Sequence, residues 1–555
     1  MDWYNNSKSA RGADQGGCIM KIIRNWKVML FVLIVAVFSS LYGFIYLESV
    51  KLPSEGWSGS IPIETYQSAY SLREPDKRNA LALSNGSEII YINGSESGLD
   101  IRKFGPLGEK MESKSVPFEY GVDALNGQLV DGSIELVTVS ESANTLNFVV
   151  IDGDTFELLS ENIQSSQGQT YQLSKTHGTT FYDDVIEVFT GSEIKSYKGL
   201  KPEIVPDSIL TDQGSVVAFV DNYMGNLKLH VLKDTGNNIS TVNIASIPVD
   251  GSTKPTKVQL IQTKSGYQVL VSLLNTKLSF TSLNTYTMSE SLEDVSITSN
   301  DLASYNGVPY YDERSETYLM GIYDNNLGRT EVARGKSVYP NFYQTDDIRG
   351  LEFTQLTNTE RIGRLPYKLE VAGYEYLIHN EYSGSEAIIY MTSTNPDVIK
   401  RSRSLEQTKP MEVFIKTIVN YPAVMFSGII PTVSILLPVL CVCLPFMMLK
   451  LSWVEQNKKT TVYMTLGLYT LSKFYVYASD IFKNFSSANI LPDYLASSSG
   501  HWSVLLCLSL ATIGIAFSRA NQVKHLNESF MKNLALYMLL DVTVLNLFFL
   551  PYTII

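Results

Sequence analysis

Residues 28–47 read VMLFVLIVAVFSSLYGFIYL, a run of twenty uncharged and mostly apolar residues. At about 1.5 Å of rise per residue, a helix of this length crosses a hydrocarbon core of about 30 Å. Lys21, Arg24 and Lys27 precede the run, and Glu48 follows it. Because Lys and Arg favour the cytoplasmic side, the run predicts a transmembrane anchor with the N-terminus inside and the chain after Glu48 outside.

Charge is distributed unevenly along the chain. Of the 44 Lys and Arg and the 56 Asp and Glu, 31 and 49 lie in residues 48–416, which gives this segment a net charge of −18. Such an acidic segment repels nucleic acid and anionic polymers and suits cations or basic peptides better. We therefore expect no nucleic-acid partner. The alternative interpretation is that the acidity only keeps a surface domain in solution.

The four cysteines are Cys18, Cys441, Cys443 and Cys507, and none lies in residues 48–416. The exported segment is therefore expected to fold without disulfides, which requires a large apolar core and argues against a eukaryotic secretory origin. Cys441 and Cys443 have neither zinc nor redox spacing.

From about residue 60 to 400 the sequence shows short alternating runs that are separated by Gly, Asn and Asp turns. The predicted unit is a strand, a tight turn, a longer strand, a second turn and a third strand. The longer strands recur every 40 to 57 residues, at Glu88–Asn93, Thr145–Asp152, Val185–Gly191, Leu227–Lys233, Tyr267–Leu274, Thr317–Tyr323 and Tyr374–Tyr382. An all-strand period of this size predicts a β-propeller, in which neighbouring blades bury one another's faces.

Seven long strands predict seven blades, with eight as an alternative, and Ser58–Leu72 is a candidate for a strand that closes the ring. Two stacked β-sandwich domains are the competing interpretation. The layout resembles β-propeller repeats, without the Gly-His and Trp-Asp pairs of WD40 repeats or the Ser-x-Asp-x-Gly-x-Thr-Trp box of sialidases. Asn85-Gly86, Asp131-Gly132 and Asp152-Gly153 predict type I′ hairpin turns, because these residues tolerate positive φ.

After the strand-rich segment the sequence becomes apolar again. Residues 411–422 predict an interfacial amphipathic helix. Four apolar runs then predict membrane spans, at Ala423–Leu449, Thr461–Phe482, Trp502–Phe517 and Asn533–Ile555. The loops with excess Lys and Arg fall on the cytoplasmic side when all five spans of the chain are counted, which places the C-terminus outside.

The expected organisation follows from these patterns. It comprises a cytoplasmic, disordered leader (1–27), a transmembrane anchor (28–47), a linker (48–57), an extracytoplasmic β-propeller-like domain (58–405), a linker or interfacial helix (406–422) and a four-span membrane domain (423–555). The expected location is the plasma membrane of a Gram-positive-like bacterium, with residues 48–422 and the C-terminus extracytoplasmic.

Lys473 and Asp541 lie inside apolar runs, where an isolated charge costs about 2.5–3.5 kcal/mol. Counted from the cytoplasmic ends of their spans, their depths differ by about 6 Å of helix rise, which a Lys side chain can bridge. We therefore predict an ion pair between Lys473 and Asp541 that joins two spans. Its functional interpretation is an ion or proton path. The alternatives are a purely structural pair, or a Lys473 side chain that reaches the membrane interface.

No other motif points to chemistry. The five histidines are His177, His230, His379, His501 and His525, and their scattered spacing argues against a zinc site. The acidic turns Asp152-Gly153-Asp154 and Asp183-Asp184 have too few ligands for a calcium loop. Because nucleophile, phosphate-loop and dinucleotide motifs are missing as well, we expect no catalytic residue, no metal and no cofactor.

The leading functional hypothesis is a multi-pass membrane protein that displays an acidic propeller as a binding or scaffolding module. Its expected partners are the lipid bilayer and a membrane or cell-envelope protein. A Tyr-lined axial mouth would suit stacking on glycans or peptides. The first alternative is a receptor-like component of a transport or signalling complex, which predicts a polar cavity joining Lys473, Asp541 and Asn546. The second is a cell-surface hydrolase or lyase.

Overall fold

The computed structural model divides the chain into two units, which are described separately. Leu52–Val332 and Ser337–Gln407 form one unit, and Met1–Lys51, Ala333–Lys336 and Thr408–Ile555 form the other. The residues that the structure describes are 35, 38–39, 41–43, 45–46, 52–67, 78–168, 170–212, 214–223, 226–236, 238–247, 251–277, 280–292, 295–300, 309–312, 314–322, 341–346, 354–357, 363–383, 386–404, 410–427, 429–485, 499–510 and 530–549.

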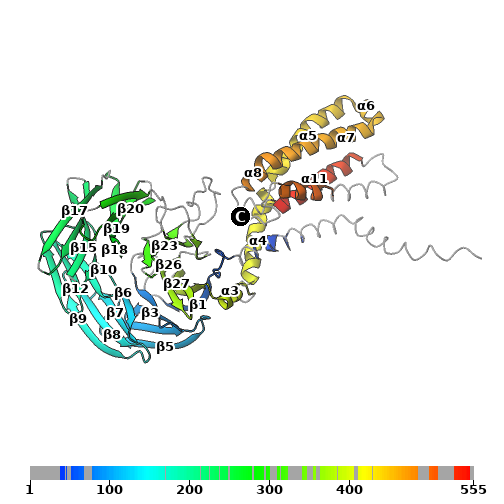
Figure 1. The fold of residues 1–555 in the computed structure, drawn as a ribbon. Helices are drawn as coiled ribbons and strands as arrows, with labels where there is room; N and C mark the ends of the chain where they lie inside the picture. Colours follow the sequence, from blue (N-terminus) through cyan, green and yellow to red (C-terminus); the bar gives the residue numbers. More distant parts are fainter. Residues whose placement is uncertain are drawn as a thin grey trace, which may run out of the picture. The chain divides into compact units, whose positions relative to one another are not determined.

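The first unit is a seven-bladed β-propeller, because its strands form seven antiparallel sheets of four strands each (Figure 1). Blades 1 to 3 are formed by β2 (Ala80–Ser84), β3 (Ile89–Ser95), β4 (Gly98–Phe104), β5 (Lys110–Pro117); β6 (Ala124–Val130), β7 (Ser133–Ser140), β8 (Thr145–Asp152), β9 (Leu158–Ser165); and β10 (Tyr171–Leu173), β11 (His177–Tyr182), β12 (Val185–Thr190), β13 (Ile194–Lys198). Blades 4 and 5 are formed by β14 (Asp207–Thr211), β15 (Gly214–Tyr223), β16 (Asn226–Asp234), β17 (Ile239–Ile247); and β18 (Thr253–Thr263), β19 (Gly266–Asn275), β20 (Phe280–Met288), β21 (Val295–Asn300). Blades 6 and 7 are formed by β22 (Tyr310–Asp312), β23 (Thr317–Ile322), β24 (Asn341–Thr345), β25 (Thr354–Gln355); and β26 (Gly363–Val371), β27 (Tyr374–Ser383), β28 (Glu386–Ser393), β1 (Ile61–Gln67).

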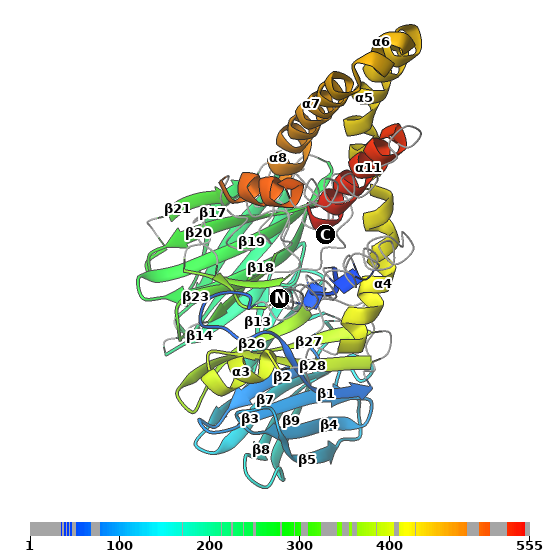
Figure 2. The ribbon, with the colours of Figure 1, turned by 90° about the vertical axis from the view of Figure 1, so that its right-hand side faces the viewer.

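The first strand of the unit closes the ring, as the sequence predicted. β1 pairs antiparallel with β28, from Ile61 opposite Met391 to Gln67 opposite Glu386. Figure 2 shows the blue β1 beside the yellow-green β28, although they lie at opposite ends of the propeller sequence. The chain therefore enters and leaves the propeller through neighbouring strands of one blade.

The predicted number of blades is confirmed, but the predicted number of strands in each blade is not. Each of the seven long strands predicted from the sequence falls in a different blade. The predicted three-strand unit is wrong, because each blade has a fourth strand. Some outer strands are mostly exposed, as β5 and β9 are, so their sequences do not show the alternation of a half-buried strand.

Two of the three predicted type I′ turns are wrong. Asp131 and Gly132 do form one, with φ of 49° and 82° between β6 and β7. At Asn85 and Asp152 the side chain instead accepts hydrogen bonds from backbone N–H groups two and three residues further on. This is the local competition typical of Asn and Asp, and it replaces the tight turn by a longer connection.

Trp57 extends the propeller into the predicted linker. Its side chain is 5% exposed and packs in a cluster with Leu319, Phe342 and Leu377. Ser54 Oγ donates to the carbonyl of Gln355 at 2.6 Å. The segment before residue 58 therefore packs against blades 6 and 7. The short helix α3 (Pro396–Ser402) follows β28.

The second unit is helical. Its elements are α4 (Pro410–Ser427), α5 (Ile429–Leu449), α6 (Leu451–Gln456), α7 (Lys458–Val476), the π-helix η2 (Tyr477–Ile481), α8 (Phe482–Phe485) and α11 (Phe530–Phe549). Residues 499–510 are also helical. α5 and α7 are joined by α6 and lie side by side in both ribbon views (Figures 1 and 2).

The helices differ in extent from the predicted membrane spans. Ala423–Leu449 covers the end of α4 and all of α5, and Thr461–Phe482 runs through α7 and η2. Of residues 28–47, the described ones are helical, and Trp502–Phe517 and Asn533–Ile555 are described only up to residues 510 and 549. Within the part of the chain that the structure describes, no helix is both long enough and apolar enough to cross a membrane.

Candidate functional site

The helix α7 carries a buried stripe of polar side chains. The stripe recurs every four residues and is at most 4% exposed throughout, at Thr461, Thr465, Tyr469, Lys473 and Tyr477. Residues four apart lie on one face of a helix, so these side chains follow one another along its axis. The last of them, Tyr477, begins the π-helix η2.

The opposite face of α7 is exposed and carries aliphatic and aromatic side chains. Tyr463, Leu471 and Tyr475 are 71%, 70% and 73% exposed, and Gly467 between them is exposed as well. This row has the same spacing as the polar stripe but is offset by two residues, which is about 200° around a helix. α7 is therefore amphipathic in the opposite sense to a helix on the surface of a water-soluble protein.

Lys473 and Asp541 meet inside the helical unit. Lys473 Nζ lies 2.8 Å from Asp541 Oδ2, and the two side chains are 3% and 0% exposed. Lys473 Nζ also donates to Ser509 Oγ at 2.9 Å, and Tyr469 donates from its hydroxyl to Asp541 Oδ2 at 2.5 Å. The centre thus combines one ammonium, one carboxylate and two hydroxyl groups from three helical segments, α7, residues 499–510 and α11.

A second polar contact lies further along the same helices. Tyr477 donates from its hydroxyl to Asn546 Oδ1 at 2.9 Å, and Asn546 Nδ2 donates to Thr432 Oγ1 of α5 at 2.8 Å. Asn546, at 2% exposed, is buried like Asp541 on the same helix. Polar side chains of α5, η2 and α11 therefore converge inside the bundle beyond the Lys473 centre.

Sequence reasoning identified only part of this site. It identified Lys473 and Asp541 by their charge and named Asn546, whereas Tyr469, Tyr477 and Ser509 were missed. The signal that would have found the two tyrosines is the spacing of four that they share with Lys473. Tyrosine is so frequent in this chain that its positions stand out only when compared along a helix.

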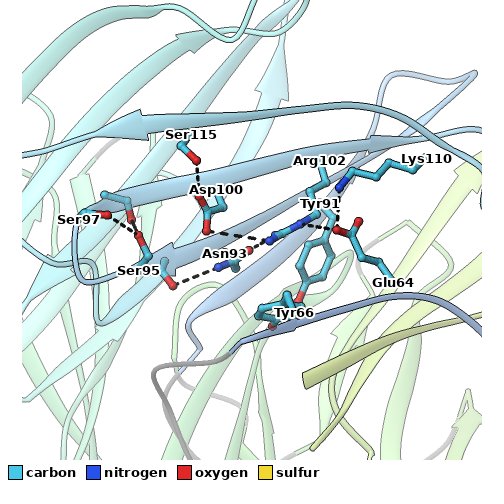
Figure 3. Close-up of polar contacts among 12 residues, drawn as sticks. Glu64, Tyr66, Tyr91, Asn93, Ser95, Ser97, Asp100, Arg102, Lys110 and Ser115 are labelled. Carbon is cyan, nitrogen blue, oxygen red and sulfur yellow. Dashed lines mark hydrogen bonds and ion pairs between the residues drawn. The ribbon is translucent and has the colours of Figure 1, made fainter. Parts of the chain in front are cut away.

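A second polar cluster joins blade 7 to blade 1 in the propeller (Figure 3). Glu64 of β1 lies between two cations, with its Oε1 3.3 Å from Arg102 Nε and 2.8 Å from Lys110 Nζ. Arg102 also donates to Asn93 Oδ1, and its guanidinium lies 4.9 Å from the centre of the Tyr66 ring. The cluster ties the closing strand to the first blade.

Buried tyrosines continue this closure. Tyr91 donates from its hydroxyl to Asn380 Oδ1 at 2.8 Å, and the Tyr66 and Tyr91 hydroxyl oxygens lie 3.0 Å apart. Burial raises the pKa of both tyrosines well above its ordinary value. Because they stay neutral and hydrogen-bonded, we assign them a structural role.

Hydrogen bonds also link successive blades through their first strands. Leu125 N donates to the Arg78 carbonyl between blades 1 and 2, and Asn126 Nδ2 to the Leu173 carbonyl between blades 2 and 3. Asp207 connects blades 4 and 5, since its Oδ2 accepts from Leu260 N at 2.8 Å. Burial raises the Asp207 pKa to about 6.

The remaining candidates from the sequence lie apart. His177 Nε2 lies 2.8 Å from the Ser208 carbonyl oxygen, and His230 Nε2 lies 3.0 Å from Asp221 Oδ2. His379 and His501 are buried, and His525 lies outside the described residues. Asp152 Oδ1 is held by the backbone of its own turn. In the described part of the chain, no three His, Cys, Asp or Glu side chains gather as metal ligands would.

The chain matches no protein-family model and no curated protein. Similar solved structures include the WD40 domain of Toxoplasma gondii coronin, at 10% identity over 60% of this chain and 88% of that one, with a TM-score of 0.35. Hydrazine synthase of Kuenenia stuttgartiensis is 10% identical over 58% of this chain and 97% of that one, with a TM-score of 0.37. Similarity at this level says nothing about activity. The structure defines a seven-bladed propeller joined to a helical unit, and a propeller is a scaffold suited to binding.

Proposed function

We propose that this protein is a multi-pass membrane protein whose helical unit lies in a lipid bilayer. Its propeller is displayed on the extracytoplasmic side as a binding or scaffolding module. The observation that carries the proposal is the inverted amphipathicity of α7, with Lys473 on the buried face and Leu471 on the exposed one. Lipid removes the cost of exposed apolar side chains and makes buried polar pairs the natural contacts between helices.

The neighbouring helices support the same arrangement. In α5 the exposed apolar side chains include Val433, Leu437 and Leu440, which are 51%, 52% and 52% exposed. α5 contains no charged residue over its 21 positions. In the propeller, by contrast, the apolar side chains form buried clusters between blades. The helical unit has a buried apolar cluster too, but its α5 and α7 also expose large apolar side chains along their outer faces, which fits a lipid environment.

The acidity of residues 48–416 suggests the chemistry of the partner. A net charge of −18 on this segment favours a basic surface over an anionic polymer. We propose a membrane or cell-envelope protein with a basic contact surface as the partner.

Catalysis is the weaker candidate. Among the described carboxyl groups on the first strands of the blades, Asp207 has the most clearly raised pKa. Its two oxygens accept from Leu260 N and Ser208 N at 2.8 and 3.0 Å, which is the geometry of a group that joins strands. A hydrolase would need a carboxyl group directed at substrate.

Membrane insertion is tested by fractionating cells that produce the full chain. We expect the full chain to stay in the membrane pellet after a carbonate wash and to float with lipid in a density gradient. The matched control is residues 52–407 with an export signal, which should stay in the supernatant. Release of the full chain by carbonate would contradict the proposal.

Partner binding is tested by cross-linking intact cells and purifying the full chain in detergent. We expect one or more envelope proteins to copurify, and the complex to weaken as salt concentration increases. The control is the chain without residues 52–407. Equal recovery of the same proteins with this control would assign binding to the helices and overturn the role of the propeller.

A further inference from the structure

We propose that the polar stripe of α7 is a proton-transfer path through the helical unit, with Asp541 as its proton-binding group. The inference rests on the proposed bilayer location. It names the proton as the species that the buried centre binds and releases.

The length of the stripe fits this role. From Thr461 to Tyr477 there are sixteen residue steps, or about 24 Å of helix rise, against a hydrocarbon core of about 30 Å. Each of the five side chains carries an oxygen or nitrogen that can form hydrogen bonds. Thr461 and Thr465 at present donate theirs to the backbone carbonyls of Asn457 and Thr461, at 3.2 and 2.8 Å. All five are buried, so the path is shielded from lipid along its length.

Stability alone does not account for the Lys473–Asp541 pair. A buried ion pair costs desolvation on both partners, and replacing both by apolar residues of similar volume is often neutral or stabilising. Two hydroxyl groups also contact the pair, since Ser509 lies 2.9 Å from Lys473 Nζ and Tyr469 lies 2.5 Å from Asp541 Oδ2. A titratable centre of this kind within apolar helices indicates a proton relay.

The contacts define a balanced proton step. A proton that arrives at Asp541 binds its carboxylate, and the contact with Lys473 Nζ weakens because the carboxyl group becomes neutral. Lys473 keeps its charge through Ser509 and the Tyr469 ring, whose centre is 5.2 Å from Nζ. When Asp541 releases the proton, the carboxylate and the ion pair are restored, with no net chemical change. Tyr537 of α11, whose ring lies 6.3 Å from that of Tyr469, is a further titratable group beside the centre.

The π-helix provides the continuation of the path. η2 begins at Tyr477, where the wider turn interrupts the regular α-helical ladder. Tyr477 contacts Asn546, and Asn546 contacts Thr432 of α5. The polar chain therefore continues beyond the Lys473 centre, on the side that follows α7.

The experiment uses the full chain reconstituted into liposomes that contain a pH-sensitive dye. A potassium-diffusion potential drives protons inward, and the initial rate is compared with that of protein-free liposomes. The decisive variant is the double substitution Lys473→Met with Asp541→Leu, which removes both charges while keeping side-chain volume. We expect the wild type to increase the proton rate at least about tenfold over empty liposomes, and the double variant to abolish the increase. The matched control is Asp480→Asn, an exposed carboxylate on η2, which should retain the wild-type rate.

Failure of this inference is distinguishable from failure of the proposed function. Flotation of the liposomes and protease protection first establish whether the protein is inserted. A wild type that is inserted but has the rate of empty liposomes overturns the proton path and leaves the membrane location intact. An unchanged rate in the folded double variant overturns the role of Asp541, whereas a wild type that does not float with lipid overturns the bilayer location.

Discussion

At the scale of single residues, Asp207 makes the propeller sensitive to pH. Its pKa is raised from 3.8 to about 6 by burial, so the folded state binds the proton more tightly than the unfolded state. Its contribution to stability is complete below about pH 4 and is lost as the pH rises through about 6. The free energy of unfolding should therefore decrease as the pH rises from about 4 to above 6. We predict that Asp207→Asn makes this decrease smaller by up to about 3 kcal/mol.

The measurement is urea unfolding of the full chain in detergent, monitored by protease resistance of the propeller at several pH values. Asp212→Asn is the control, because Asp212 is an exposed carboxylate close to the end of β14. His177 titrates in the opposite sense, since burial lowers its pKa and its contribution is lost as the pH falls. The prediction would be refuted if the free energy of unfolding depended on pH in the same way for Asp207→Asn and for the wild type.

Arg102 is predicted to stabilise the closed ring. Arg102→Met removes the buried cation that contacts both Glu64 and Asn93, while Lys110 stays beside Glu64, so we expect a loss of about 2 kcal/mol in the free energy of unfolding. Lys110→Met removes the other cation beside Glu64, but the Lys110 side chain is 45% exposed, so its loss should stay below about 1 kcal/mol. Equal losses for the two variants in urea unfolding would contradict the role of burial.

Residue-scale prediction from the sequence was limited by what a single position reveals. Lys473 and Asp541 were paired because charge is conspicuous in an apolar run. Arg102 and Glu64 were not paired, because their contact depends on β1 joining a blade that is formed more than three hundred residues later. No local sequence pattern reveals a pairing between strands that lie so far apart in the chain.

At the scale of elements, the hairpins test how turn residues set strand geometry. Ala372 and Gly373 connect β26 to β27 with φ of 51° and 80°, the type I′ conformation. A left-handed conformation costs a residue with a Cβ about 1–2 kcal/mol, and Asn tolerates it better than Ala. We predict that Ala372→Asn stabilises the propeller by about 0.5–1 kcal/mol in urea unfolding.

The matched control for this prediction is Asp131→Ala in the equivalent turn between β6 and β7. Asp131 has φ of 49° and is exposed, as Ala372 is. The two substitutions should therefore change the free energy of unfolding by similar amounts and in opposite directions. A destabilising Ala372→Asn would mean that contacts outside the turn determine this connection.

Elements were predicted well where burial leaves a period in the sequence. β8 was predicted with its observed bounds, and its alternate residues are buried. β9 follows β8 as the third strand of the predicted unit, but its bounds were not predicted, because its side chains are almost all exposed and its sequence shows no alternation. The span predicted over Thr461–Phe482 covers most of α7, but the polar stripe that sets which face is buried was not recognised, because average hydropathy conceals it.

At the scale of the whole molecule, the closure of the ring links the N-terminal and C-terminal parts of the propeller. β1 supplies one strand of blade 7, and the other three strands come from residues 363–393. Without β1, the edge of β28 is unpaired and the face of blade 7 loses Ile61 and Tyr66, which are 0% and 7% exposed. An unpaired edge favours aggregation.

The last prediction follows from this closure. The fragment of residues 52–407 should fold alone, because it holds all seven blades and their closing strand. A fragment of residues 78–407 lacks β1 and should aggregate or be digested by protease at least about tenfold faster. Adding a synthetic peptide of residues 52–67 should restore its protease resistance, because β1 then pairs with β28 from a separate chain. A peptide with Tyr66 and Ile61 both replaced by Ser is the control and should fail to restore it. If the shorter fragment is as resistant as the longer one, β1 is dispensable and the ring is held by the contacts between blades alone.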